Sequence, residues 1–312
     1  MSEPAIVVQD LYKSVGTSFC LGPLSLSIPK GVVCALIGPN GAGKTTLMRA
    51  AVGLQPVRTG AVRILGSALH GNRDVLRHVG FTPDTPPMYD NLTVRQFLHF
   101  VGMGYDLSPA ETRERIDFWL EKVWLSEKAN QRIKQLSRGM RQRVGIARTL
   151  LPNPSIILLD EPAAGLDPAG RAQFRQLLAS LRDQGKALIV SSHILSDMDE
   201  YCTHIGIMSE GRMTRCGTVA EVAQAAHGDR CRYTILLARP FPQLAAIVAT
   251  IPGVSDVNAD TDRMVLEYGI ARDEAAVLLS SLMNLGIPVA GFSANAGSLE
   301  ETYLRSQIRQ VE

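Results

Sequence analysis

The sequence contains no apolar run long enough to cross a lipid bilayer. Its apolar stretches, such as those within Ser155–Leu159 and Ala187–Val190, have the length of strands, whereas a spanning helix needs about 18 apolar residues. The opening residues, MSEPAIVVQD, are acidic at the start and offer no apolar core of a secretory signal. We therefore expect a protein of the cytosol.

Cysteines are few, and none forms a CxxC pair. The five occur at scattered positions and leave an odd total: Cys20, Cys34, Cys202, Cys216 and Cys231. This distribution argues against a disulfide framework and against a zinc site, and it favours a reducing compartment.

Neither sign of charge dominates the sequence. Thirty-two Lys and Arg residues oppose 30 Asp and Glu residues, which leaves a formal net charge of +2. That balance excludes a protein that coats nucleic acid or a membrane surface through its overall charge. Hydrophobic residues make up 46% and charged residues 20% of the chain, values typical of folded proteins, and 312 residues suffice for about two domains.

The first 227 residues have the pattern of an α/β domain. Short apolar runs alternate with longer helical patterns, which predicts a largely parallel sheet. The expected strands are Ala5–Val8, Val32–Ile37, Val62–Leu65, Ile156–Leu159, Ala187–Val190 and His204–Met208. Residues 85–151 contain no such run beyond Asn91 and are expected to form a mainly helical insert, over Val94–Val101, Pro109–Lys122 and Arg138–Leu151.

A second domain is expected over residues 228–312, after a linker near Ala225–Asp229. Its predicted elements follow the order β-α-β-β-α-β, with strands at Arg232–Ala238, Val254–Ala259, Arg263–Tyr268 and Val289–Ser293 and helices at Pro242–Ile251 and Asp273–Leu285. This order is typical of a small ferredoxin-like α+β domain. Ser298 and Glu301 form a capping-box pattern for a closing helix.

A phosphate-binding loop follows the strand VVCALI. The segment GPNGAGKTT matches GxxxxGK[ST] in full and comprises Gly38, Pro39, Asn40, Gly41, Ala42, Gly43, Lys44, Thr45 and Thr46. Its glycines let backbone N–H groups face phosphate oxygens, Lys44 adds a cation for the β- and γ-phosphates, and the Thr45 hydroxyl is placed to ligate Mg²⁺. GTPases, kinases, recombinases and transport ATPases all share this loop. The loop alone therefore does not identify which class of nucleotide-binding enzyme this protein belongs to.

Two carboxylates end a buried strand. In SIILLDEP, Asp160 and Glu161 follow four apolar residues, and a parallel strand delivers such residues to the sheet edge where α/β folds bind ligands. Asp160 is expected to hold the Mg²⁺ hydration shell. Glu161 is expected to orient or deprotonate the attacking water, so the pair predicts phosphoryl transfer.

Three further motifs carry a resemblance to a known family. LSRGM, followed by a basic amphipathic helix, precedes the acidic strand; AGLDP with Asp167 follows it; and a later strand ends in SSH at His193. This order resembles that of ATP-binding cassette (ABC) ATPases over residues 5–225. The resemblance implies a P-loop NTPase cassette with a RecA-like core sheet, an antiparallel β part and a helical subdomain.

The resemblance also implies a mechanism. Two cassettes dimerise head to tail around two Mg-ATP, so that Ser137 and Gly139 contact the γ-phosphate bound to the partner cassette. His193 contacts the γ-phosphate within its own cassette, and Asp167 runs along the interface. Apart from the family motifs, the helical pattern alone places Arg141 and Arg143 on a solvated helix face.

The sequence departs from the common family pattern at three places. Asp84 stands where the family has a glutamine that senses Mg²⁺ and the membrane partner. Val15 stands where an aromatic usually stacks on adenine, which leaves Val15 itself, Tyr12 or Phe19 as the contact. In the signature, an arginine and a methionine replace glycine and glutamine, as is familiar among exporter-type cassettes.

Transport is the function that the remaining features favour. The Pro-rich segment from Pro86 to Tyr89 resembles the start of the groove that receives a permease helix, whereas Phe97, Phe100 and Trp119 are expected in the core of the insert. The terminal SLEETYLR resembles the extension of bacterial exporter cassettes whose permease is a separate chain.

We therefore expect an ATPase homodimer on the cytoplasmic face of the inner membrane, bound to a multi-span permease, with no nucleic-acid partner. A heterodimer with a related cassette stays possible as an alternative. The rival class is a non-transport ABC ATPase, but a single cassette without long heptads argues against it, and no NKxD motif supports a GTPase.

Overall fold

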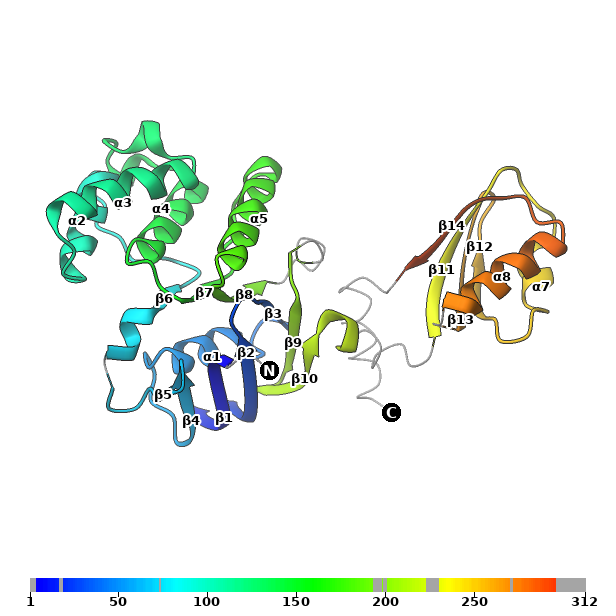
Figure 1. Cartoon of the computed structure of the whole chain (residues 1–312), viewed down its shortest axis with the longest axis horizontal. Coiled ribbons are helices and arrows are strands. Elements are labelled where there is room, and N and C mark those ends of the chain that lie inside the picture. The colour runs from blue at the N-terminus through cyan, green and yellow to red at the C-terminus, as the bar shows by residue number, and fades with distance from the viewer. Residues whose placement is uncertain are drawn as a thin grey trace. The chain divides into compact units, whose positions relative to one another are not determined.

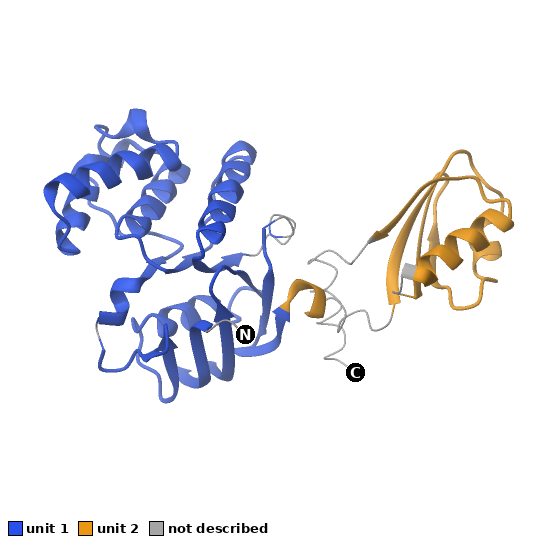
Figure 2. Cartoon of the chain, viewed as in Figure 1, with its two compact units in different colours: residues 1–217 blue, residues 218–312 orange. Residues whose placement is uncertain are grey.

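The protein separates into two compact units, residues 1–217 and residues 218–312 (Figure 2). The structure is a computed structural model that describes residues 4–16, 19–72, 74–192, 198, 201–222, 230–269 and 272–295. The linker expected near Ala225–Asp229 and the closing helix expected after Ser298 lie outside these residues.

An antiparallel sheet of four strands forms one part of the first unit. Its order is β2-β1-β4-β5, with β1 at Pro4–Val15, β2 at Phe19–Pro29, β4 at Thr59–Ile64 and β5 at Ser67–Ala68. In β2, Leu24, Leu26 and Ile28 are buried and alternate with exposed neighbours, because successive side chains of a strand face opposite sides. Strand β2 is absent from the strands expected from the sequence.

A six-stranded sheet forms the centre of the first unit, in the order β10-β9-β3-β8-β7-β6. The strands are β3 Val33–Ile37, β6 Val79–Thr82, β7 Ile156–Asp160, β8 Ala187–Ser192, β9 His204–Ser209 and β10 Arg212–Thr218. β3, β7 and β8 are buried throughout and pair in parallel with their neighbours. Continuous apolar runs of this kind are typical of strands that are covered on both faces. Helices α1, Lys44–Ala51, and α5, Pro168–Asp183, follow β3 and β7 along the chain.

A group of helices lies between β6 and β7 in the sequence (Figure 1). It contains α2 Val94–Gly104, α3 Pro109–Lys122 and α4 Arg138–Leu150, with short 3₁₀ turns at Ser126–Lys128 and Ile133–Gln135; a further 3₁₀ turn, Asp74–His78, precedes β6. The three helices begin at hydroxyl N-caps, Thr93, Ser108 and Ser137, whose side chains accept backbone N–H bonds.

The second unit has the predicted ferredoxin-like fold. Its elements are β11 Arg230–Leu237, α7 Leu244–Val248, β12 Ser255–Ala259, β13 Arg263–Gly269, α8 Arg272–Asn284 and β14 Val289–Asn295. The sheet order is β12-β13-β11-β14, antiparallel at every step. Tyr233, Leu266 and Leu282 are fully buried in its core, so this unit has a hydrophobic core of its own.

No helix within the described ranges is long and apolar enough to traverse a bilayer.

Candidate functional site

The loop between β3 and α1 requires glycine at specific positions. Gly38 has φ 157°, and a Cβ there would lie 2.3 Å from the carbonyl oxygen of Met208. Gly43 is the N-cap of α1 at φ 100°, and a Cβ there would lie 2.9 Å from Cδ1 of Leu21. Larger residues at either position meet both backbone strain and a collision. The loop conformation therefore depends on these two glycines.

Lys44 folds back over the loop that precedes it. Its Nζ donates hydrogen bonds to the carbonyl oxygens of Gly38, at 2.6 Å, and of Pro39, at 3.2 Å. Burial lowers the pKa of Lys44, and the charges of Glu161 and Asp160 oppose that shift. The ammonium group thus sits at the loop, within the field of both carboxylates.

Asp160 meets the loop through Thr45. Asp160 is 1% exposed at the end of β7, and the Thr45 hydroxyl donates to its Oδ2 at 2.7 Å. The structure therefore brings the predicted pair of metal-ligating oxygens together at the carboxyl end of the sheet.

Ser191 is a residue of this site that the sequence analysis missed. It lies opposite Asp160 in the parallel register of β7 and β8, is fully buried, and donates from Oγ to Oδ1 of Asp160 at 2.6 Å. The same Oγ accepts a hydrogen bond from the backbone N–H of Glu161 at 2.9 Å. The only sequence signal is a serine within the SSH strand end, and that signal does not say which strand lies next to β8.

Glu161 adopts a left-handed backbone conformation with φ 48°. This region is uncommon for residues other than glycine, and it concentrates at functional sites. The Ser191 contact holds the Glu161 backbone in place, directly after the buried strand.

These groups line one cavity of about 540 Å³, which we call the loop cavity. Its lining is formed by Asn40 to Thr46 of the loop, Asp160 and Glu161, together with Val15, Phe19 and Asp84. Val15 is 37% exposed and Phe19 is half-buried beside it. Tyr12, the other aromatic considered for adenine, bonds to Sγ of Cys20 and does not line the cavity.

Three predicted residues lie away from the loop cavity. Ser137 caps α4 by accepting the N–H of Met140 at 3.3 Å, and Asp167 caps α5 by accepting the N–H of Gly170 at 3.1 Å. Gly139 faces the loop before α5 so closely that a Cβ would lie 2.8 Å from the carbonyl oxygen of Gly165. None of the three lines the loop cavity. His193 lies outside the described residues.

The expectation of a solvated face is wrong for Arg143, whose side chain is 19% exposed, whereas that of Arg141 is 36% exposed. Arg141 forms an ion pair with Asp90, and the Arg143 guanidinium lies 3.8 Å from Oδ1 of Asp167. Arg143 also lies over the ring of Trp124, 5.8 Å from its centroid. Both arginines therefore connect α4 to neighbouring segments of the chain.

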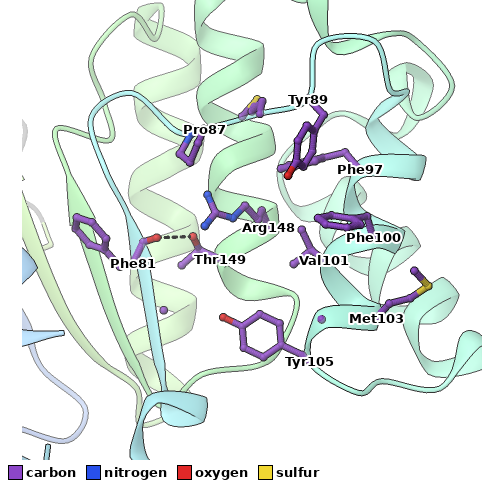
Figure 3. A pocket seen from close by; sticks show the side chains of 13 residues that line it. Phe81, Pro87, Tyr89, Phe97, Phe100, Val101, Met103, Tyr105, Arg148 and Thr149 are labelled. Carbon is purple, nitrogen blue, oxygen red and sulfur yellow. Dashed lines mark hydrogen bonds between the residues drawn. The ribbon is translucent and has the colours of Figure 1, made fainter. Parts of the chain in front are cut away.

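A second cavity, of about 620 Å³, lies between β6, α2 and α4 (Figure 3). We call it the aromatic groove; it is lined by Gly80, Phe81, Pro87, Met88, Tyr89, Phe97, Phe100, Val101, Met103, Gly104, Tyr105, Arg148 and Thr149. Phe97 and Trp119 are buried, as expected for the insert core, but Phe100 is 51% exposed. The sequence pattern did not separate Phe100 from Phe97 because both fall within one apolar helix.

Residues 21–164 match the family model described as ABC transporter. An uncharacterized ABC transporter ATP-binding protein of Synechocystis sp. is 33% identical over 93% of this chain and 78% of its own length. The daunorubicin resistance ATP-binding protein DrrA3 of Streptomyces coeruleorubidus is 30% identical over 97% of this chain and 96% of its own length.

Solved structures similar to this chain carry the same description as these relatives. A structure described as the ATP binding subunit of an ABC transporter has a TM-score of 0.66 and 31% identity, and the match covers 71% of this chain and 92% of that chain. Together with the loop, the paired carboxylates and the P-loop cassette fold, these likenesses identify the chain as a member of the ABC transporter family, as an ATP-binding subunit.

Proposed function

We propose that this protein hydrolyses Mg-ATP as a dimer of cassettes and thereby drives a separate membrane permease of an exporter. The observation that carries the proposal is the loop cavity, where a lysine, a hydroxyl and two carboxylates from separate elements converge. In phosphoryl transfer the protein acts mainly through positioning and charge stabilisation, and these are the groups that such a reaction needs.

The phosphates of ATP would bind across the loop from Gly38 to Thr46. Backbone N–H groups and the N-terminus of α1 attract the anion, and Lys44 would exchange its contacts with loop carbonyl oxygens for contacts with the β- and γ-phosphates. Val15 and Phe19 lie in the same cavity, so we assign them the apolar contact with the adenine ring.

The donor set also fits Mg²⁺. Thr45 and Asp160 present oxygen atoms 2.7 Å apart, and the exposed carboxylate of Asp84 lines the same cavity; oxygen is the ligand that Mg²⁺ prefers. When bound, the ion supplies neutralisation of charge on the phosphate oxygens. Asp84 would then take over the position that the family gives to glutamine.

Glu161 is assigned the role of general base or water-orienting group. It follows the metal-site carboxylate directly, lines the cavity, and is held by the Ser191 contact to its backbone N–H. By the family resemblance, His193 would contact the γ-phosphate. Both roles concern the attack of water on the terminal phosphorus.

A head-to-tail dimer accounts for the residues that lie away from the cavity. Ser137 and Gly139 stand at the N-terminus of α4, which suits an anion, yet neither lines the loop cavity. A second cassette would bring its bound ATP to them, with Asp167 along the interface. The Arg143 contact to Asp167 supports the alignment of these segments.

The permease would dock in the aromatic groove. A lining of aromatic and methionine side chains suits an amphipathic helix from another protein. The name of the Streptomyces relative concerns drug resistance, and the terminal SLEETYLR pattern also favours export. We accordingly expect the protein on the cytoplasmic face of the inner membrane, without a nucleic-acid partner.

Substitution of Glu161 tests the hydrolytic assignment. Glu161→Gln should reduce ATP turnover at least about a hundredfold and trap an ATP-bound dimer, measured by phosphate release and size-exclusion chromatography. Glu127→Gln, on an exposed turn, is the matched control. A Glu161→Gln variant that turns over ATP at the wild-type rate would refute the role.

Affinity purification of the Glu161→Gln protein tests the transport assignment. With Mg-ATP present, a stoichiometric multi-span membrane protein should co-purify from detergent-solubilised native cells. Ribosomal, DNA-bound or wholly soluble partners instead would identify a non-transport ABC ATPase and leave the ATPase assignment intact.

For the second unit we propose regulation or stabilisation of the cassette dimer. It has its own core and follows the ATPase unit along the chain. Deletion of residues 230–312 should alter dimerisation or ATPase regulation, and unchanged values of both would remove this assignment.

A further inference from the structure

The aromatic groove exposes an unusual share of large apolar side chains. Tyr89 is 56%, Phe100 51%, Met103 56% and Tyr105 37% exposed, and all four line the groove. The rings of Tyr89 and Phe100 meet edge-on, with centroids 5.4 Å apart. Rings in mutual contact form a pre-arranged apolar surface, which binds a partner at little cost in side-chain entropy.

One cation interrupts this apolar surface. Arg148 extends from α4 toward Pro87 and lines the groove together with Phe100 and Tyr105 (Figure 3), and burial lowers the pKa of its guanidinium. Within the described part of the chain, Arg148 has neither an ion pair nor a hydrogen bond. It is therefore a partly desolvated charge without a counter-ion of its own.

Three nearby arginines of the helical group have partners. Arg141 pairs with Asp90, Arg143 approaches Asp167, and Arg115 donates to Glu111 and to the carbonyl oxygen of Leu151. Arg148 thus differs from Arg141 and Arg143 on the same helix. An arginine left unpaired in apolar surroundings loses hydration without compensation, so a ligand that brings a carboxylate gains more here than at a solvated arginine.

We propose that the occupant of the aromatic groove is an amphipathic helical segment of the permease that carries one Asp or Glu within its apolar face, paired with Arg148. The proposal rests on the function proposed above and adds the chemistry of the partner. The aromatic rim supplies the apolar contact, and the planar guanidinium fits a carboxylate with two parallel hydrogen bonds.

The pairing also selects which helix the permease engages. Arg148 and Thr149 line the groove near the end of α4, whose N-cap is Ser137. Thr149 in turn bonds to Thr82 at 2.6 Å and to the carbonyl oxygen of Phe81 at 3.3 Å. A carboxylate on Arg148 therefore attaches the permease to the same rigid helix that presents the signature residues.

Binding by charge variants is the first test. Full-length Arg148→Met and Arg148→Lys proteins, together with the exposed control Arg113→Met on α3, are used to capture the permease from detergent-solubilised membranes. Melting temperatures verify that each variant is folded. Arg148→Met should bind at least about thirtyfold more weakly, because the partner's carboxylate is then buried unpaired, whereas Arg113→Met should bind like the wild type.

A zero-length cross-link tests the carboxylate directly. In the Arg148→Lys complex, a carbodiimide should join the introduced amine to one Asp or Glu of the permease, and mass spectrometry identifies that residue. The matched Arg113→Lys protein should give no such product. Reversing the identified acid to Lys should weaken wild-type binding by a similar factor.

The outcomes separate the two levels of the proposal. Capture of the permease by wild type, Arg148→Met and Arg148→Lys alike, without a cross-link at position 148, would overturn the paired carboxylate and leave the transport function intact. Absence of any membrane protein from the wild-type capture would overturn both.

Discussion

Substitution of Ser191 by alanine should damage both the stability and the turnover of the ATPase unit. Ser191 is fully buried, and its Oγ makes two contacts, a donated bond to Asp160 and an accepted bond from the Glu161 N–H. Loss of a hydrogen bond to a charged group costs about 1.5–3 kcal/mol, and an unsatisfied buried N–H adds about 1 kcal/mol or more. The expected loss of stability is therefore about 2.5–4 kcal/mol.

The same change should loosen the Glu161 backbone. Its positive φ is a strained conformation that persists only while its surroundings enforce it, so we expect kcat to fall about ten- to a hundredfold with little change in KM. Urea unfolding and steady-state phosphate release measure the two effects. Ser180→Ala, at an exposed position of α5, is the control for the loss of a serine hydroxyl.

A double-mutant cycle tests whether Ser191 acts through Asp160. If Ser191 acts through Asp160, the stability loss of Ser191→Ala should be smaller in an Asp160→Asn background, because the charged acceptor is already gone. A Ser191→Ala protein that unfolds and hydrolyses ATP like the wild type would show that the buried contact contributes nothing.

Three further predictions concern other contacts. Gly43→Ala should cost about 1–3 kcal/mol in urea unfolding and weaken ATP binding, because the position combines φ 100° with a close approach to Leu21; unchanged unfolding and ATP affinity would contradict the glycine argument. Thr149→Val should destabilise by about 1–3 kcal/mol by leaving the buried hydroxyl of Thr82 unpaired, whereas adding Thr82→Val should restore most of that loss; equal unfolding midpoints for the single and double variants would speak against the pairing. Burial raises the pKa of the Cys34 thiol well above its usual range, so at pH 8 a thiol reagent should modify exposed Cys20 but reach Cys34 only in urea, and rapid native labelling of Cys34 would be inconsistent with its burial.

Elements with strong local signals were predicted closely. Helix α3 was expected at Pro109–Lys122 and is found there, because Ser108, Pro109 and Glu111 together mark a helix start. The ferredoxin-like order of the second unit was also predicted. Strand β2 was missed, because short alternating Leu and Ser residues give a weaker signal than a continuous apolar run.

The exposure and contacts of individual side chains were predicted less well than the helices and strands. Phe100 was expected in the core and is half exposed, and Arg143 was expected in solvent and contacts Trp124 and Asp167. Apolar periodicity marks a helix face but does not say which partner covers each residue of that face. These errors fall where several elements meet.

The sequence by itself determined the chemistry that is local in the chain. The phosphate loop, the acidic pair and the helix caps each depend on residues within one short segment, so their types and spacing suffice to identify them. The tertiary structure alone decided that Ser191 lies beside Asp160, that Arg148 stands without a counter-ion within the described residues, and that Ser137 lies apart from the loop cavity. Parallel strands bring together residues from distant parts of the sequence, and the order in which the strands pair depends on how the whole core packs.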